Sequence, residues 1–293
     1  MIKRSVIIES KSSLTVSNNQ LNIVSEMRSG SVPIEDLGYL VLDHHEIYIS
    51  MPALVALSDN NVATIICNKN HLPQGMFLSL NAHHIQQEIF SSQIQASAAL
   101  KKNLWRQTIV EKITNQGLLL KQVRNEENHF PFLANKVLSG DSSNMEAVAA
   151  SFYWKHLWEA DFKRERHGDF PNSFLNYGYA ILRAAVARSL AAAGLLNTLG
   201  IHHKSKYNAF ALADDIMEPF RPIVDEIVVN LVSEGITELT REVKVKFLDM
   251  LTRTVYWKDE VSPLMVAIQK TCQSLRQCYD GDRKKIKYPQ LWN

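Results

Sequence analysis

Cysteine is scarce in this sequence, and it has no long apolar run. Cys67, Cys272 and Cys278 lie far apart, and no Cys-x-x-Cys pair occurs. Such a set is unsuited to a disulfide framework or a structural zinc site, and it is typical of proteins in a reducing compartment. No stretch approaches the roughly 18 consecutive apolar residues that a membrane-spanning helix needs. We therefore expect a cytoplasmic protein with no membrane partner.

The motifs of nucleotide-driven enzymes and of serine or zinc hydrolases are also missing. The sequence contains no Gly-x-x-x-x-Gly-Lys-[Ser/Thr], no Gly-x-Gly-x-x-Gly, no His-Glu-x-x-His and no Gly-x-Ser-x-Gly. A net charge of +2 over 293 residues gives no global basic field. Residues 1–82 hold 5 Lys and Arg against 7 Asp and Glu, whereas the remainder holds 27 against 23. A polyanionic partner is therefore more plausible for the second part of the chain.

The pattern of the sequence changes near residue 78. Before it, short β-branched runs separated by polar turns predict strands at 6–8, 13–16, 20–24, 39–42, 46–49 and 62–67, and a short helix at 51–57. After it, a 3.6-residue period predicts helices at about 83–116, 116–125, 131–138, 144–165, 172–194, 208–235, 240–256 and 260–279. The sequence thus predicts an α+β protein. A small β-sandwich-like domain at 1–78 precedes a large all-α domain at 79–293.

The most informative segment combines a histidine pair with a group of carboxylates. Gly-Ile-His-His at 200–203 is followed, twelve residues after His203, by Asp-Ile-Met-Glu-Pro-Phe-Arg-Pro at 215–222. Asp215 and Glu218 stand three residues apart and would project from one helix face. Imidazole nitrogen and carboxylate oxygen suit Mn²⁺ or Mg²⁺ better than a thiolate-preferring metal. Taken alone, however, a histidine is more often a structural residue than a metal ligand.

Two further helical blocks carry candidate functional residues. Glu146 lies among small residues at 147–151, and a carboxylate on a closely packed helix needs a counter-charge or a cation. An exposed glutamate is the alternative. In the block at 176–188 a buried core helix is the simpler interpretation for most positions. Its candidate pocket or phosphate-binding residues are Asn176, Tyr177, Arg183 and Arg188.

Basic residues are interleaved with Trp154 and Trp158 in the segment that follows. This arrangement fits a nucleic-acid-binding face, with a solvated helix end as the equal alternative. The candidate DNA-binding residues here are Lys155, Lys163, Arg164 and Arg166. A basic, turn-rich tail at 281–289 is predicted to be a solvated flexible end in preference to a DNA contact.

Taken in order, the three helical blocks resemble the CRISPR-associated integrase, which inserts new spacers into CRISPR arrays, and in particular its type II subgroup. The resemblance covers most of the chain and is most specific over 176–225. It implies that the metal-binding catalytic residues are Glu146, His203 and Glu218. It also implies that Asp215 and Asn176 are candidates to contact and orient these ligands, while His202 points elsewhere.

The resemblance implies a metal-dependent DNA integrase and endonuclease that uses Mg²⁺ or Mn²⁺. The 3′-OH of a short prespacer duplex would attack a phosphodiester at a CRISPR repeat, so the partner is double-stranded DNA. A homodimer formed through the β domain and a complex with a second, smaller CRISPR adaptation protein are also implied. The RNA-guided effector nuclease is a further candidate partner. Two alternatives stay open, a non-catalytic DNA-binding scaffold of the adaptation complex and a general branched-DNA nuclease.

Overall fold

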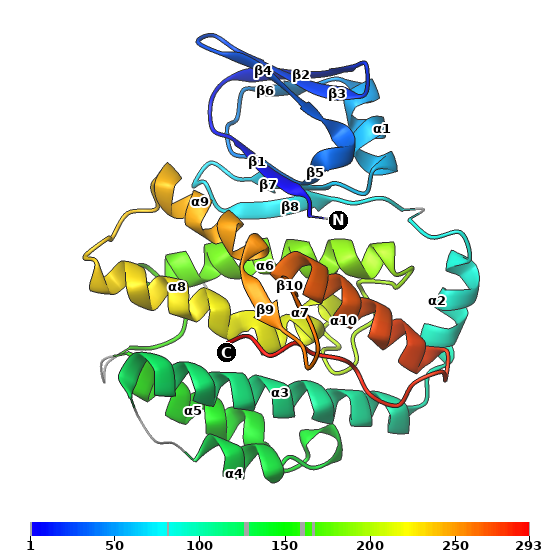
Figure 1. Ribbon diagram of the computed structural model, residues 1–293, viewed down its shortest axis with the longest axis vertical. Coiled ribbons are helices and arrows are strands. Elements are labelled where there is room, and N and C mark those ends of the chain that lie inside the picture. The colour runs from blue at the N-terminus through cyan, green and yellow to red at the C-terminus, as the bar shows by residue number, and fades with distance from the viewer. Residues whose placement is uncertain (1, 81, 126–128, 159–161, 166–167, 293) are drawn as a thin grey trace.

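The computed structural model describes residues 2–80, 82–125, 129–158, 162–165 and 168–292. Two sheets form the N-terminal part, and helices form most of the rest (Figure 1), so the predicted α+β class is confirmed. One sheet has the order β4 (Ser29–Pro33), β3 (Gln20–Ser25), β2 (Ser12–Ser17) and β6 (Ile47–Ile49). The other has the order β1 (Arg4–Ile8), β5 (Leu37–Leu42), β7 (Ala63–Cys67) and β8 (Pro73–Phe77).

A compact apolar core lies within the N-terminal part. Leu14, Leu21, Leu40 and Leu57 are fully buried in it, the last contributed by α1 (Met51–Asp59). The turn at 18–19 joins β2 to β3 with φ angles of 50° and 58°, which asparagine tolerates and which suit a tight hairpin. Alternating apolar residues therefore form this core as the sequence predicts.

The sheet β1-β5-β7-β8 has a second buried face, which packs on the helices. Tyr39 and Val41 of β5 belong to the large helical core, whereas Leu40 between them belongs to the β core. This division follows from the alternation of side chains along a strand. Ion pairs also join the sheet to the helices. Lys244 Nζ of α9 (Arg241–Asp249) lies 2.6 Å from Asp43 Oδ2 and 3.1 Å from Glu9 Oε1. The two parts of the chain are thus joined by an extensive apolar and ionic contact.

Helix α6 (Asn172–Ala192) is the centre of the helical part and contacts α7 (Ala211–Met217), α8 (Arg221–Ser233), α9 and α10 (Leu264–Tyr279). On the far side of α8 lies the long α3 (Ala98–Arg124), which carries α4 (Phe130–Asn135) and α5 (Met145–Leu157) (Figure 1). Helix α2 (Gln86–Gln95) contacts α10. Within the described ranges, no helix combines the length and apolar character needed to cross a bilayer.

Gly178 permits the close contact of α6 with α8 and α9. A Cβ at this position would lie 2.4 Å from Val224 Cγ1 and 2.7 Å from Phe247 Cε1. We expect Gly178→Ala to lower the free energy of unfolding by about 3 kcal/mol, because packed side chains must move apart. Gly30→Ala is the control, since a Cβ there meets nothing within 4 Å. Urea unfolding measures both variants, and equal stabilities would contradict this account of the packing.

Several predicted elements differ from the structure. The edge strands β4 and β8 are not among the predicted strands, because their Ser, Gly and Pro residues hide the strand pattern. The strands β9 (Thr254–Tyr256) and β10 (Val261–Pro263) form a hairpin where the ends of two helices were predicted. The predicted break at Gly117 is wrong, because α3 continues through this buried position. Tertiary pairing and packing override the local signal in each case.

The C-terminal segment packs against the body of the protein, so the prediction of a flexible end is wrong. Ile286, Leu291 and Trp292 are buried. The hydroxyls of Tyr288 and Thr108 are 2.9 Å apart, and residues 256 and 290 exchange backbone hydrogen bonds of 2.8 Å. The apolar residues that lie among and after the basic residues of the tail account for this packing.

Candidate metal and nucleic-acid site

The loop before α7 is fastened to one fully buried carboxylate, that of Asp215. Its Oδ2 accepts hydrogen bonds from the backbone N–H groups of Ile201 at 2.6 Å and His202 at 2.9 Å. Its Oδ1 accepts from the His203 N–H at 3.2 Å and lies 2.5 Å from His203 Nδ1. A Cβ at Gly200 would lie 2.8 Å from Asp215 Oδ2, so the close approach of the loop requires glycine there. Asp215 therefore fixes the position of the His203 ring.

The two neighbouring histidines have different surroundings. The hydrogen bond to Asp215 raises the pKa of His203 and leaves Nε2 as the ring nitrogen available to a metal ion. Histidine ligands commonly donate their other ring N–H to a carboxylate in this way. His202 instead stacks on Trp105, with ring centroids 4.3 Å apart and ring planes within 4°. The structure thus places His203, and not His202, in the setting expected of a ligand.

Glu146 and Glu218 approach each other around a lysine that the sequence analysis did not single out. Glu146 lies in the first turn of α5, and Glu218 begins the short helix η3 (Glu218–Phe220). Lys112, from the middle of α3, places Nζ 2.7 Å from Glu146 Oε1 and 2.6 Å from Glu218 Oε2. These contacts put the two carboxylate oxygens no more than 5.3 Å apart.

Glu218 is held charged by two neighbouring cations, the buried Lys112 and the partly buried Arg221. Burial by itself disfavours the carboxylate form, but Arg221 and Lys112 outweigh burial and lower the pKa of Glu218 to about 2. Arg221 Nε lies 2.9 Å from Glu218 Oε1. Neither contact has the directional geometry of a hydrogen bond, and Glu218 Oε2 has no hydrogen-bond partner in the described part of the chain. This oxygen is charged and buried, and the Lys112 ammonium is the cation that lies against it.

The three predicted ligands have donor types that suit a divalent metal ion. Two carboxylates and an imidazole are ligands that Mg²⁺ and Mn²⁺ accept, and the Lys112 ammonium shows that a positive charge is already stable between the carboxylates. Among the residues described, no three His, Cys, Asp or Glu side chains form a group that could hold a metal ion. The assignment of Glu146, His203 and Glu218 as ligands therefore stays a prediction.

A cavity of about 220 Å³ adjoins Glu218, with Lys112, Gln116, Arg164, Tyr179, Arg221 and Asp225 in its wall. Asp225 accepts hydrogen bonds from the hydroxyls of Tyr153, at 2.7 Å, and Tyr179. The guanidinium groups of Arg221 and Arg164 lie 4.6 and 5.3 Å from the centre of the Tyr179 ring. Two guanidinium groups and an ammonium thus converge beside Glu218, which gives the cavity the cationic donors that a phosphate requires.

The buried Asp225 gives stability a measurable dependence on pH. Burial raises its pKa from 3.8 to about 6, although two tyrosine hydroxyls oppose the shift. Because the folded protein holds this proton more tightly than the unfolded chain, the wild type loses stability as pH rises through 6. The free energy of unfolding of Asp225→Asn, taken relative to that of the wild type, should therefore be about 1–2 kcal/mol higher at pH 8 than at pH 5. Urea unfolding at both pH values measures this, and a pH-independent difference would contradict it.

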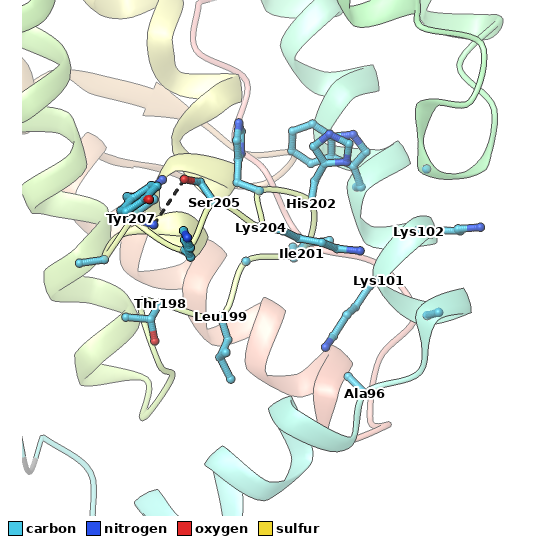
Figure 2. Close-up of a pocket in the computed structure, with 18 residues that line it drawn as sticks. Ala96, Lys101, Lys102, Thr198, Leu199, Ile201, His202, Lys204, Ser205 and Tyr207 are labelled. Atoms are coloured by element: carbon cyan, nitrogen blue, oxygen red, sulfur yellow. Dashed lines mark hydrogen bonds between the residues drawn. The ribbon is translucent and has the colours of Figure 1, made fainter.

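A second hollow, of about 1140 Å³, opens beside His203 between the start of α3 and the loop at 198–209 (Figure 2). Its charged and imidazole side chains are Lys101, Lys102, Lys204, Lys206, His202 and His203. No aspartate or glutamate occurs among the described residues that line it. We call this hollow the lysine cleft. Its charge suits a polyanion, and the Lys-x-Lys after the histidine pair was a signal that sequence reasoning missed.

The candidate DNA-binding residues in and after α5 have different surroundings. Lys155 and Lys163 are exposed. Arg164 is half-buried and donates hydrogen bonds to Asn172 Oδ1 at 3.0 Å and Asn176 Oδ1 at 2.7 Å. Asn176 therefore supports Arg164 in this structure. Arg166 lies outside the described residues.

The candidates on α6 are engaged within the protein. Tyr177 is fully buried against Phe247, so its prediction as a DNA contact is wrong for this structure, because the side chain is part of the core. Arg188 donates to Asn61 O at 2.6 Å and lies over the Tyr39 ring, which joins α6 to the β part.

Arg183 Nε lies 2.6 Å from Asp214 Oδ1. Asp214 lies in the first turn of α7, after the N-terminal flanking residue Phe210. Its carboxylate also accepts a hydrogen bond from Asn208 Nδ2 at 2.8 Å. Asp214 thus fastens the loop before α7 to α6, beside the carboxylate of Asp215.

Comparison with known proteins identifies the family. Residues 5–255 match the family described as CRISPR associated protein Cas1. The chain is 34% identical over 296 residues to the CRISPR-associated endonuclease Cas1 of Neisseria meningitidis serogroup C (strain 8013), which covers 99% of this chain and 97% of the relative. The chain belongs to the Cas1 family. The resemblance noted in the sequence is thereby confirmed.

Solved structures share this fold over nearly the whole chain. A casposase bound to integration product superimposes with a TM-score of 0.79 at 19% identity, covering 98% of this chain and 93% of the other. A chain of a Cas6-RT-Cas1–Cas2 complex superimposes with a TM-score of 0.77 at 20% identity, covering 99% of this chain and 36% of that longer one. At these identities the likeness establishes the fold, and the chemistry is argued from the residues.

Proposed function

We propose that this Cas1-family protein is a spacer integrase and endonuclease of a CRISPR adaptation complex, of the type II subgroup. It joins the 3′-OH ends of a short DNA duplex to phosphodiesters at a CRISPR repeat. The observation that carries the proposal is the meeting of Glu146 and Glu218 around one buried cation. The family match, shared over nearly the whole length of an endonuclease relative, supports it.

The proposed catalytic residues are Glu146, His203 and Glu218, which would hold Mg²⁺ or Mn²⁺. When bound, such an ion supplies charge neutralisation at the phosphate and stabilises the attacking or leaving oxygen. The residues of the chain do the rest. Asp215 orients His203, while Arg221 and Arg164 face the cavity and are placed to bind phosphate oxygens.

The lysine cleft is the proposed path of the DNA backbone to the site. Its lysines and Trp105 lie next to His203, so a strand bound there would reach the proposed ligands. Contacts to phosphate carry no sequence information directly, so we propose binding that is sequence-tolerant and weakened by salt. Lys155 and Lys163, both exposed, are proposed as further phosphate contacts.

The proposed assembly follows the family. Residues 1–78 and 79–293 are proposed as the dimerisation and catalytic domains, and exposed apolar residues on the β part, among them Val24, Met27 and Tyr48, support a protein contact there. A second, smaller adaptation protein is the proposed partner, since a solved structure with this fold is named as a complex of Cas1 with Cas2. The RNA-guided effector nuclease is a further proposed partner.

Strand transfer tests the function. A labelled duplex with free 3′-OH ends is incubated with a plasmid carrying a CRISPR repeat, the partner adaptation protein and Mn²⁺ or Mg²⁺. We expect metal-dependent joined product from the wild type and from His202→Ala, and a loss of about 100-fold or more in His203→Ala. DNA binding without product in the wild type would favour a scaffold. Cleavage of branched DNA without joining would favour a general nuclease, and equal loss in both variants would remove the assignment of His203.

A further inference from the structure

Lys112 occupies the position that the proposed function gives to a metal ion. It comes from the middle of α3, and its ammonium makes a directed hydrogen bond to Glu146 Oε1 at 2.7 Å. Its contact with Glu218 Oε2, at 2.6 Å, lacks hydrogen-bond geometry and leaves that oxygen without a hydrogen-bond partner in the described residues. Lys112 is therefore in close contact with both carboxylates.

A second polar side chain near Lys112, that of Gln116, has an oxygen without a hydrogen-bond partner in the described part of the chain. Gln116, one helical turn further along α3, is buried and lines the cavity beside Glu218. Its Oε1 atom has no hydrogen-bond partner among the residues that the structure describes. A buried acceptor without a donor is costly, so this oxygen can accept a hydrogen bond from a donor that enters the cavity.

The charges of the cluster are balanced without a metal ion. Glu146 and Glu218 contribute two negative charges, and Lys112 and Arg221 contribute two positive charges within 2.9 Å of these carboxylates. A divalent ion added between the same carboxylates would face the ammonium as a like charge at short range. Such a contact in a buried site is strongly unfavourable unless one of the cations moves away. Lys112 carries the flexible side chain, whereas Arg221 packs on Tyr179.

We propose that Lys112 is an internal cation that a divalent metal ion displaces. In the metal-free protein its ammonium holds Glu146 and Glu218 together, and metal binding is an exchange in which the ammonium leaves both carboxylates. The inference rests on the proposed function, because it takes these two glutamates as ligands. Lys112 is accordingly a positioning residue for the ligand set, and the displaced ammonium becomes available to a phosphate oxygen in the cavity.

Metal affinity, measured without any reaction, tests this exchange. Metal-free wild type, Lys112→Met and Lys121→Met are titrated calorimetrically with MnCl₂. Lys121 is the matched control, because it is an exposed lysine on the same helix. We expect Lys112→Met to bind Mn²⁺ about tenfold more tightly, since the ion no longer competes with a buried like charge. Lys121→Met should match the wild type, and Mn²⁺ should raise the melting temperature of Lys112→Met more than that of the wild type.

Two further variants separate this inference from the proposed function. Glu146→Gln and Glu218→Gln should each abolish the Mn²⁺ binding seen in the wild type. If binding depends on both glutamates but Lys112→Met binds no more tightly, the exchange is overturned and the proposed function stands. If Mn²⁺ binding does not depend on the two glutamates, both the ligand assignment and the proposed exchange are wrong.

A measurement on the wild type covers the case in which Lys112→Met does not fold. The ammonium resonance of Lys112, in protein with ¹⁵N-labelled lysine, is assigned through its loss in Lys112→Arg and followed during addition of Mg²⁺. Displacement predicts a shift or loss of this resonance as the ion binds. An unchanged resonance at saturating Mg²⁺ would overturn the proposal.

Discussion

Replacing Asp215 with asparagine is expected to lower strand transfer by about 10- to 100-fold and the free energy of unfolding by about 3 kcal/mol. The carboxylate accepts hydrogen bonds from three backbone N–H groups and faces His203 Nδ1. Asparagine offers one acceptor oxygen in place of two and turns its own N–H₂ group toward other donors. The loop then loses its anchor and His203 its orientation.

Asp214→Asn is the matched control for this result, because it changes the adjacent carboxylate of the same helix. Asp214 pairs with Arg183, whose side chain is 37% exposed, and accepts a hydrogen bond from Asn208. A partly solvated ion pair contributes less, so we expect a loss of about 1 kcal/mol and strand transfer within a few-fold of the wild type. Urea unfolding and the strand-transfer assay measure both variants. Similar losses in the two would show that Asp215 has no special role in orienting His203.

The fold was predictable where one local pattern decides the outcome. Strand 13–16 alternates apolar and polar side chains, strand 39–42 is a continuous apolar run, and the Asn18-Asn19 turn fits only a few backbone conformations. Strand β8 was not predictable, because Pro73 and Gly75 are tolerated there only at the edge of a sheet that β7 provides. Its neighbours in space, and not its own sequence, determine that it is a strand.

The candidate site was predictable only in its sequence-local part. The twelve-residue interval between His203 and Asp215 allowed the two to meet, and the structure brings Nδ1 and Oδ1 to 2.5 Å. Lys112 carried no such signal, because a lysine in the middle of a helix is ordinarily a solvated residue. It reaches Glu146 and Glu218 because α3 packs on α5 and η3, and no residue near it in sequence predicts that packing.

Glu218→Gln is expected to lower strand transfer by more than about 100-fold and the free energy of unfolding by about 3–5 kcal/mol. The substitution keeps the shape of the side chain and removes its charge, so it removes a proposed metal ligand. It also leaves the buried Lys112 and the partly buried Arg221 with one carboxylate fewer. The control is Glu234→Gln, which breaks the exposed pair with Lys246 and should change stability by less than about 1 kcal/mol.

A double variant separates the two effects of Glu218→Gln. Adding Lys112→Met removes one of the cations that the glutamine leaves unbalanced, so we expect the double variant to regain part of the lost stability. Strand transfer should not return, because a restored charge balance does not replace a metal ligand. If the double variant regained both stability and strand transfer, the contribution of Glu218 would be structural, and the proposed metal-binding carboxylate would have to be sought elsewhere in the site.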